Sequence, residues 1–225
     1  MIPAAKGGPI GWLWDRYVGW KFRSAFRGLW VRGTLPAGEA SRLVYVNHSN
    51  WWDGFVLHQL AQAAGWDAYC LMDEKNLARY RFLTRIGAFS IRPGDASSTL
   101  ESLRYARQLL RQPRAAMYLF PEGEHRPFGV LPLRLERGIE LLARAARVDC
   151  LPIAVRYAFC EHERPEVLVE VGTAHPAGEL SMFQENLEAV VRRVASATSL
   201  EGFTRVVRGG SGVAERWDAV RRLQT

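Results

Sequence analysis

The chain has 225 residues, which is enough for one α/β domain with a substantial core and short for two compact domains. Hydrophobic residues make up 48% and charged residues 24%, proportions typical of a folded globular protein and not of a disordered one. The formal net charge of +7 favours an anionic partner, such as nucleic acid, an anionic bilayer or a phosphorylated substrate. Part of this charge reflects compositional bias, since only Lys6, Lys21 and Lys75 among the 30 basic residues are not Arg.

Three cysteines, Cys70, Cys150 and Cys160, give an odd count without a CxxC pair, so a complete disulfide framework is not expected. The sequence lacks the apolar run of roughly 20 residues that a transmembrane helix needs. Its start also lacks the compact apolar core of a secretory signal peptide. We therefore expect a protein that is neither exported nor held in a bilayer by a spanning helix.

Residues 1–32 differ in composition from the rest of the chain. Residues 10–30 hold four of the eight Trp residues, and Arg16, Arg23 and Arg27 are spaced so that they would share one side of a helix. Aromatic side chains beside basic ones are typical of the headgroup boundary of a membrane. The segment is therefore predicted to be an amphipathic helical anchor that makes the protein peripheral or monotopic at the cytoplasmic face of an anionic membrane. A helix that only packs on the domain is the alternative.

After a loop at residues 33–41, strand-like runs alternate with helical patterns along the chain. Strands are expected over residues 42–46, 67–72, 88–92, 115–120, 148–155 and 167–171. Helices are expected over residues 51–64, 76–85, from a cap at Ser97 or Ser98 to 111, 133–147, 180–197 and 213–223. This alternation predicts an α/β fold for residues 33–225, with a largely parallel or mixed sheet flanked by helices.

The first motif with chemical potential is Asn47-His48, after a strand, followed by Asp53 at the start of a helix. Residues five apart do not share a face of a regular helix, so His48 and Asp53 can meet only if His48 lies in the turn before the helix. The carboxylate would then orient the imidazole, whose other nitrogen would be free to accept a proton from a hydroxyl. A hydrogen-bonded structural His is the alternative for the pair on its own.

The second motif is FPEG at residues 120–123, again where a strand ends. Pro and Gly favour a tight turn there, and ligands bind to α/β sheets at the ends of such strands. His125 and Arg126 follow directly. Without the first motif, these residues would be read only as a charged turn.

Together the two motifs resemble those of the glycerolipid acyltransferase family, which includes the 1-acylglycerol-3-phosphate (lysophosphatidate) acyltransferases. The NHxxxxD motif of that family corresponds to Asn47, His48 and Asp53, and its FPEG motif to residues 120–123. Two further motifs of the family are similar to residues 87–92, where a Gly precedes an apolar strand and an Arg, and to the apolar strand around Pro152. The resemblance runs in order from about residue 42 to residue 157.

The resemblance implies O-acyl transfer from an acyl thioester, carried by CoA or by acyl carrier protein, to a lipid hydroxyl. It implies no covalent acyl-enzyme, no metal and no redox cofactor. His48 would be the general base and Asp53 its assistant, while Arg92, Glu122 and Gly123 would help to bind a glycerol-phosphate head group. Arg suits this task because it forms bidentate, charge-assisted hydrogen bonds with phosphate.

The residues after FPEG depart from the family's pattern. Thr-Arg-Ser is common there, whereas this chain has Glu124, His125 and Arg126, so His125 or Arg126 would have to replace the shifted Arg in substrate binding. The expected acceptor is 1-acylglycerol-3-phosphate or another lysophospholipid; a glycolipid, an amino-acid lipid and a glycosylated isoprenoid are alternatives. Trp51 and Trp52 would suit a bulky acceptor, and equally would suit helix packing.

Other functional classes fit the sequence less well. The G-x-S-x-G elbow of serine hydrolases and the glycine patterns of nucleotide-binding folds are absent, and nucleic acid is not expected as a partner. The principal alternative is a non-catalytic, basic membrane-binding protein, since Arg104, Arg107, Arg111 and Arg114 share a helix side. Such a protein would tolerate His48→Ala, whereas an acyltransferase would not.

Overall fold

The computed structural model describes the chain except residues 161, 214–216, 218–220 and 222–225, and except the side chain of Ile10. The strands are β1 (Gly28–Arg32), β2 (Arg42–Val46), β3 (Asp67–Asp73), β4 (Ala88–Ile91), β5 (Ala115–Leu119), β6 (Asp149–Ala158), β7 (Glu166–Val171) and β8 (Thr204–Arg208). The helices are α1 (Gly8–Ala25), α2 (Asp53–Ala64), α3 (Glu74–Arg79), the 3₁₀ helix η1 (Arg81–Ile86), α4 (Ala96–Leu109), α5 (Gly138–Ala146) and α6 (Leu180–Ala195).

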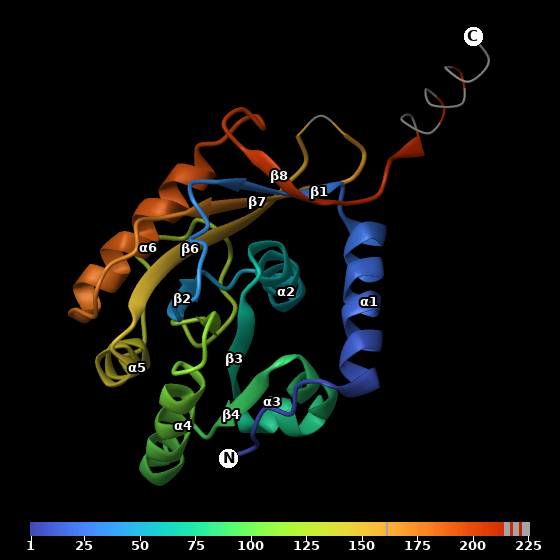
Figure 1. Ribbon diagram of the computed structural model, residues 1–225. Helices are drawn as coiled ribbons and strands as arrows, with labels where there is room; N and C mark the ends of the chain where they lie inside the picture. Colours follow the sequence, from blue (N-terminus) through green and yellow to red (C-terminus); the bar gives the residue numbers. More distant parts are fainter. Residues whose placement is uncertain (161, 214–216, 218–220, 222–225) are drawn as a thin grey trace.

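The strands form one eight-stranded sheet in the order β4-β3-β5-β2-β6-β7-β1-β8 (Figure 1). All neighbours from β4 to β6 are parallel. The pairs β6–β7 and β1–β8 are antiparallel, while β7 and β1 are parallel. The predicted α/β architecture with a mixed, largely parallel sheet is therefore confirmed.

Helices cover both faces of the sheet, with α1 and α2 on one side and α4, α5 and α6 on the other (Figure 1). Strand β2 shows why, since all five of its residues are buried. Leu43 and Tyr45 belong to the core cluster shared with α4, α5 and α6, whereas Val44 and Val46 belong to the cluster shared with α1 and α2. A parallel strand buried on both faces needs apolar side chains at successive positions, which is the pattern of this run.

The predicted extent of the N-terminal helical segment needs correction. Helix α1 ends at Ala25, and residues 28–32 form β1, which pairs with β7 and β8 inside the sheet. Arg27 lies beyond the helix, where it contacts His162 and Glu166, and so does not share a helix side with Arg16 and Arg23. Within the described residues, no helix has the length and apolarity needed to cross a membrane.

Other boundaries also differ from the sequence expectation. Asp95 caps α4 by accepting a hydrogen bond from the Ser98 backbone N–H at 3.0 Å, so neither Ser97 nor Ser98 is the cap. Helix α5 begins at Gly138 rather than at residue 133, and β8 was not predicted. The helix expected over residues 213–223 lies largely outside the described residues.

Candidate active site

The two sequence motifs meet at one edge of the sheet. Strands β4, β3, β5 and β2 are parallel, so the loops after them emerge on the same side. Strand β2 leads into Asn47 and His48, and its neighbour β5 leads into the FPEG turn. This is the edge at which α/β sheets bind ligands. Motifs more than 70 residues apart in sequence are thus brought into contact.

Asn47 fixes the backbone from which His48 projects. Its buried side-chain amide donates to the carbonyl of Val155 on β6 at 3.0 Å and accepts from the backbone N–H of the same residue at 2.8 Å. Both hydrogen-bonding groups of the amide are therefore used, as burial of a polar side chain requires. The end of β2 is held against β6 by this pair of bonds.

His48 and Asp53 meet as their spacing required. Asp53 is the first residue of α2, and His48 lies in the turn before it. Nδ1 of His48 and Oδ2 of Asp53 are 2.8 Å apart, so the imidazole donates from Nδ1 and keeps an unshared electron pair on Nε2. The His48 side chain is 22% exposed, whereas that of Asp53 is fully buried. This arrangement is suited to general base chemistry, with the carboxylate fixing the tautomer.

Four donors surround the buried Asp53 carboxylate. Besides His48, the backbone N–H groups of Ser49 and Asn50 donate to Oδ2 at 2.9 and 3.0 Å, and the hydroxyl of Tyr157 donates to Oδ1 at 2.7 Å. A buried charge is costly unless it is hydrogen-bonded in this way. The carboxylate is therefore held in position, with Oδ2 directed at the imidazole of His48.

Tyr157 was not among the predicted site residues. It lies on β6, 104 positions from Asp53 in sequence, and its ring packs 5.6 Å from that of Phe26. Burial, followed by the charge of Asp53, raises its pKa, so the hydroxyl remains protonated and can donate. The only sequence signal for this residue is its place on the strand that contains Pro152.

Two rings contact the imidazole of His48. The ring of Phe120 stacks on it with a centroid distance of 4.0 Å and an interplanar angle of 19°, and the ring of His125 approaches to 3.9 Å at 50°. Burial, and then the charge of His48, lowers the pKa of His125. His125 is therefore neutral near pH 7 and adds no cationic repulsion when His48 takes up a proton.

The turn after β5 brings Glu122 and Arg126 to His48. Oε2 of Glu122 accepts from the backbone N–H of His48 at 3.4 Å, and the carbonyl of His48 accepts from the backbone N–H of Arg126 at 2.8 Å. Burial raises the pKa of Glu122. Gly123 has a φ of +72°, a conformation that favours glycine, and its N–H closes the turn onto the carbonyl of Phe120.

Arg126 lies in the same small hollow as His48, Asn47 and Glu122. Its guanidinium pairs with Glu124 at 2.7 Å and lies 3.8 Å from Oε1 of Glu122. Among the described residues, neither the buried Nε of Arg126 nor Oε1 of Glu122 has a hydrogen-bond partner. Although Arg126 is displaced by one position from the family's pattern, it still lies beside His48. Its Nε and Oε1 of Glu122 are both left with the capacity to form a hydrogen bond to a ligand.

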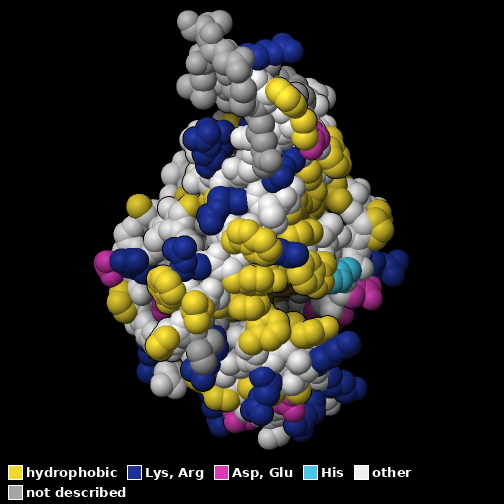
Figure 2. Space-filling model, turned by 90° about the vertical axis from the view of Figure 1, so that its right-hand side faces the viewer, with side chains coloured by type: hydrophobic (Ala, Val, Ile, Leu, Met, Phe, Trp, Pro, Cys, Tyr) yellow, Lys and Arg dark blue, Asp and Glu magenta, His cyan; other side chains and the backbone are white. Residues whose placement is uncertain are grey.

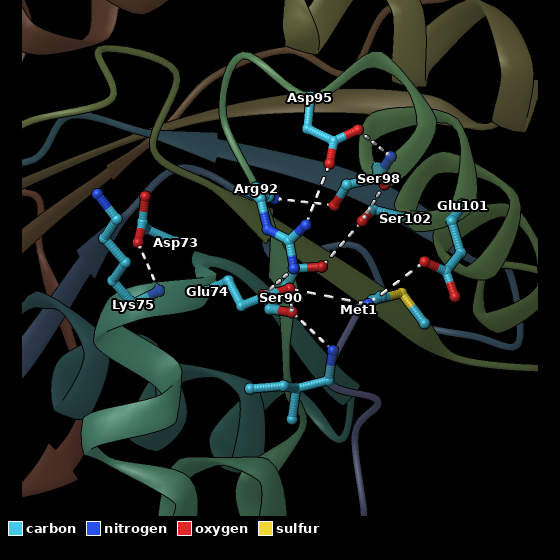
Figure 3. A network of polar contacts seen from close by, with 11 residues as sticks. Met1, Asp73, Glu74, Lys75, Ser90, Arg92, Asp95, Ser98, Glu101 and Ser102 are labelled. Carbon is cyan, nitrogen blue, oxygen red and sulfur yellow. Dashed lines mark hydrogen bonds and ion pairs between the residues drawn. The ribbon is translucent and has the colours of Figure 1, made fainter.

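Arg92 lies at the same edge but in a different group of side chains. It donates to Glu74 at 2.6 Å and to Asp95 at 3.1 Å, and its backbone N–H donates to the hydroxyl of Ser98 (Figure 3). Strands β3 and β5 separate β4 from β2, which corresponds to about 14 Å at about 4.8 Å per strand. The described contacts thus bring together His48, Asp53, Glu122, His125 and Arg126, and they leave Arg92 apart.

A partly exposed His48 bonded to a buried Asp53 at the carboxyl edge of an α/β sheet, beside a charged turn, is an arrangement suited to base-assisted group transfer. The family described as Acyltransferase matches residues 31–156, more than half of the chain. The chain therefore belongs to the Acyltransferase family, which confirms the family-level prediction from its motifs.

Comparison of sequences with curated proteins gives no match. Among solved structures, the chain is similar to the 1-acyl-sn-glycerophosphate (LPA) acyltransferase PlsC from Thermotoga maritima, with a TM-score of 0.54 and 16% sequence identity. The similarity covers 80% of this chain and 78% of that one. At this level of identity the likeness establishes a shared fold.

Proposed function

We propose that the protein transfers a fatty acyl group from a thioester of CoA or acyl carrier protein to the hydroxyl of a lipid. The observation that carries the proposal is the 2.8 Å contact between His48 and the buried Asp53 in a member of the Acyltransferase family. Nε2 of His48 takes the hydroxyl proton while the oxygen attacks the thioester carbonyl. The C–S bond then breaks, and the thiolate leaves with the proton from His48 as a free thiol.

The surroundings of His48 support this proton transfer. Asp53 stabilises the imidazolium that forms, because its carboxylate is held by Ser49, Asn50 and Tyr157 and needs no rearrangement. Neutral His125 keeps a second positive charge away from that cation. The site therefore lowers the cost of charge that exists only during the reaction.

A lysophospholipid, with 1-acylglycerol-3-phosphate first, is the proposed acceptor. The phosphate of such a lipid lies only a few bonds from the reacting hydroxyl, so its ligand must lie close to His48. Arg126 meets this requirement, since it shares the hollow with His48 and has a buried Nε without a hydrogen-bond partner among the described residues. Arg92, the other predicted phosphate ligand, lies three strands along the sheet from β2 and is already paired with Glu74 and Asp95.

A specific observation favours a second candidate, an acyltransferase for a neutral acceptor such as a glycolipid. Arg126 already has Glu122 and Glu124 as neighbours, and Arg92 has Glu74 and Asp95. A phosphate would meet like-charged carboxylates at either position, whereas hydroxyl groups of a sugar would find acceptors there.

Acceptor-dependent thiol release tests the proposal. Purified protein is assayed with acyl-CoA and with acyl carrier protein against lysophosphatidate, other lysolipids and glycolipids. We expect release that depends on one acceptor class and is lost in His48→Ala with unchanged folding. A response to lysophosphatidate that weakens in Arg126→Gln assigns phosphate binding to Arg126, and a response to glycolipids alone selects the second candidate. Release by His48→Ala at the wild-type rate contradicts the proposed mechanism.

A further inference from the structure

Helix α1 is apolar on two opposite faces. Val18 and Phe22 are buried against the domain, whereas Leu13, Tyr17 and Trp20 have exposed fractions of 58%, 41% and 58%. The exposed residues are spaced by four and three, so they form one stripe along the helix. An exposed apolar stripe of this kind on a surface helix is typical of an interaction site. In the part of the chain that the structure describes, the domain covers only one face of α1.

The exposed stripe continues into the catalytic motif through a chain of aromatic contacts. Tyr17 and Trp14 lie 5.1 Å apart, Trp14 and Phe55 6.3 Å, and Phe55 and Trp51 4.8 Å, measured between ring centroids. Trp51 is one of the residues between His48 and Asp53, and it is 63% exposed. The apolar surface thus reaches the loop that carries the candidate base.

The same surface extends to the 3₁₀ helix η1. Trp14 contacts Phe82 at 4.6 Å, and Phe82 contacts Tyr80 at 6.1 Å; both latter residues are exposed. We name the whole set the aromatic surface. Its exposed members are Leu13, Tyr17, Trp20, Trp51, Tyr80 and Phe82.

Basic side chains surround the aromatic surface. Figure 2 shows apolar side chains gathered in a continuous patch on the face that carries α1, with Lys and Arg at its margins. Exposed arginines on the contributing segments are Arg16, Arg23, Arg79, Arg81 and Arg85. Exposed Trp and Tyr beside Arg are suited to the headgroup boundary, where an aromatic body is buried and a charged group meets phosphate.

We propose that the aromatic surface docks on an anionic lipid bilayer and that Trp51 of the catalytic motif inserts with it. The basic margin would repel a second copy of the same surface, whereas it complements anionic head groups. Docking in this orientation brings the loop of His48 to the lipid surface, so the acceptor can enter from the bilayer. This role in catalysis rests on the proposed function, but the docking itself requires no chemistry.

Binding to vesicles of phosphatidylcholine, with and without phosphatidylglycerol, tests the docking surface. All variants are made in the His48→Ala chain, so the result does not depend on turnover. Leu13→Ser and Trp51→Ser should each weaken binding to anionic vesicles about tenfold, because each removes a large apolar side chain from the buried contact. The matched control is Leu141→Ser on α5, on the far side of the sheet (Figure 1). Leu141 is 53% exposed, similar to Leu13, but lies outside the aromatic surface. The control should change binding less than about twofold.

Three results would overturn the proposal. If Trp51→Ser binds vesicles as tightly as the parent His48→Ala chain, the catalytic motif is not part of the docking surface, even if Leu13→Ser weakens binding. Equal effects of Leu13→Ser and Leu141→Ser would show that α1 has no special part in docking. Self-association that Leu13→Ser abolishes, without vesicle binding, would assign the surface to a second copy. Absence of acyl transfer with any donor would contradict the proposed function and leave these binding results unchanged.

Discussion

Two groups of polar side chains at one edge of the sheet differ in burial and in preferred charge state. At the ends of β2 and β5, the side chain of Asp53 is fully buried, and burial raises the pKa of Glu122. At the ends of β3 and β4, the hydrogen bond from Arg92 lowers the pKa of Glu74, while the Ser98 backbone N–H does the same for Asp95. Burial is therefore the main influence on the pKa of Glu122 in the first group, whereas hydrogen bonds favour the charged forms of Glu74 and Asp95 in the second.

The difference separates proton transfer from simple charge pairing. Burial of the Asp53 carboxylate strengthens its electrostatic interactions, so in the proposed mechanism this fixed carboxylate stabilises a proton moving onto His48. The exposed pairs of Arg92 are screened by solvent and hold loops in place without a comparable effect on a reaction. The two arginines of the edge are therefore not equivalent, and the predictions below separate the two groups.

Replacing the base should have the largest effect. His48→Ala removes the group that accepts the hydroxyl proton, and general base catalysis contributes about a thousandfold to the rate. We expect a fall in kcat of that order, with folding retained because the side chain is partly exposed. Thiol release under saturating acceptor measures kcat, and a fall smaller than about tenfold would contradict the role of His48.

Removing the charge of Asp53 should have the next largest effect. In Asp53→Asn the side-chain oxygen can still accept from His48, Ser49 and Asn50, while the amide can donate to Tyr157, so the shape of the site is kept. The imidazolium loses its stabilising charge, and kcat should fall about a hundredfold. The same assay measures the fall in kcat, and thermal melts monitored by circular dichroism show whether the fold is retained.

Loss of the Tyr157 hydroxyl should have a smaller effect on rate. Tyr157→Phe keeps the ring against Phe26 and leaves Oδ1 of Asp53 without its donor. Hydrogen bonds to charged groups contribute about 1.5–3 kcal/mol, so we expect a loss of unfolding free energy in that range and a fall in kcat of about tenfold. Denaturant unfolding and steady-state kinetics measure the two quantities. Unchanged kcat would show that the hydroxyl supports only the fold.

The arginines should differ in their effect on acceptor binding. Arg126→Gln removes the arginine that shares the hollow with His48 and should raise KM for lysophosphatidate about tenfold, as expected for a lost charge-assisted hydrogen bond. Arg92→Gln removes an exposed residue of the other group and should change KM less than about threefold. The reverse order would place the phosphate at the end of β4.

The smallest effects should be on the pH dependence of stability, with opposite signs for Glu122 and Glu74. The pKa of Glu122 is raised above its ordinary value of 4.5, so the folded state keeps this proton to a higher pH than the unfolded state does. The free energy of unfolding therefore falls as pH rises above about 4.5 through the pKa of the folded state. Glu122→Gln should remove this loss. The pKa of Glu74 is lowered, so its contribution is present above about 4.5 and is lost on acidification; Glu74→Gln should remove that contribution. Denaturant unfolding between pH 4 and pH 8 compares the slopes, and equal signs would contradict the contrast.

Local sequence determined the part of the site that could be predicted. His48 and Asp53 are separated by one turn, so their meeting depends on the backbone between a strand and a helix. The FPEG turn could be assigned to a ligand-binding edge because it, too, follows a strand, and ligands bind to α/β sheets at the ends of such strands. Both the α/β class and the strand that carries Pro152 followed from the pattern of apolar residues along the sequence.

The remaining features depend on contacts between distant segments. Tyr157 reaches Asp53 from another strand, and nothing near Tyr157 in sequence indicates this bond. Strand β1 was read as helix because the aromatic run continues through it, and only pairing with β7 and β8 makes it a strand. The carboxylates that hold Arg92 come from α3 and from the cap of α4, so its separation from His48 became visible only in the structure.

The central claim is that His48 and Asp53 act as one proton-transfer unit. A double-mutant cycle tests it most directly, with kcat measured for His48→Ala, Asp53→Asn and the double variant under saturating donor and acceptor. Residues that act through one another have effects that do not add, so the double variant should lose about as much activity as His48→Ala alone. A double variant whose loss equals the product of the two single losses would show that the residues act independently, and would contradict the account.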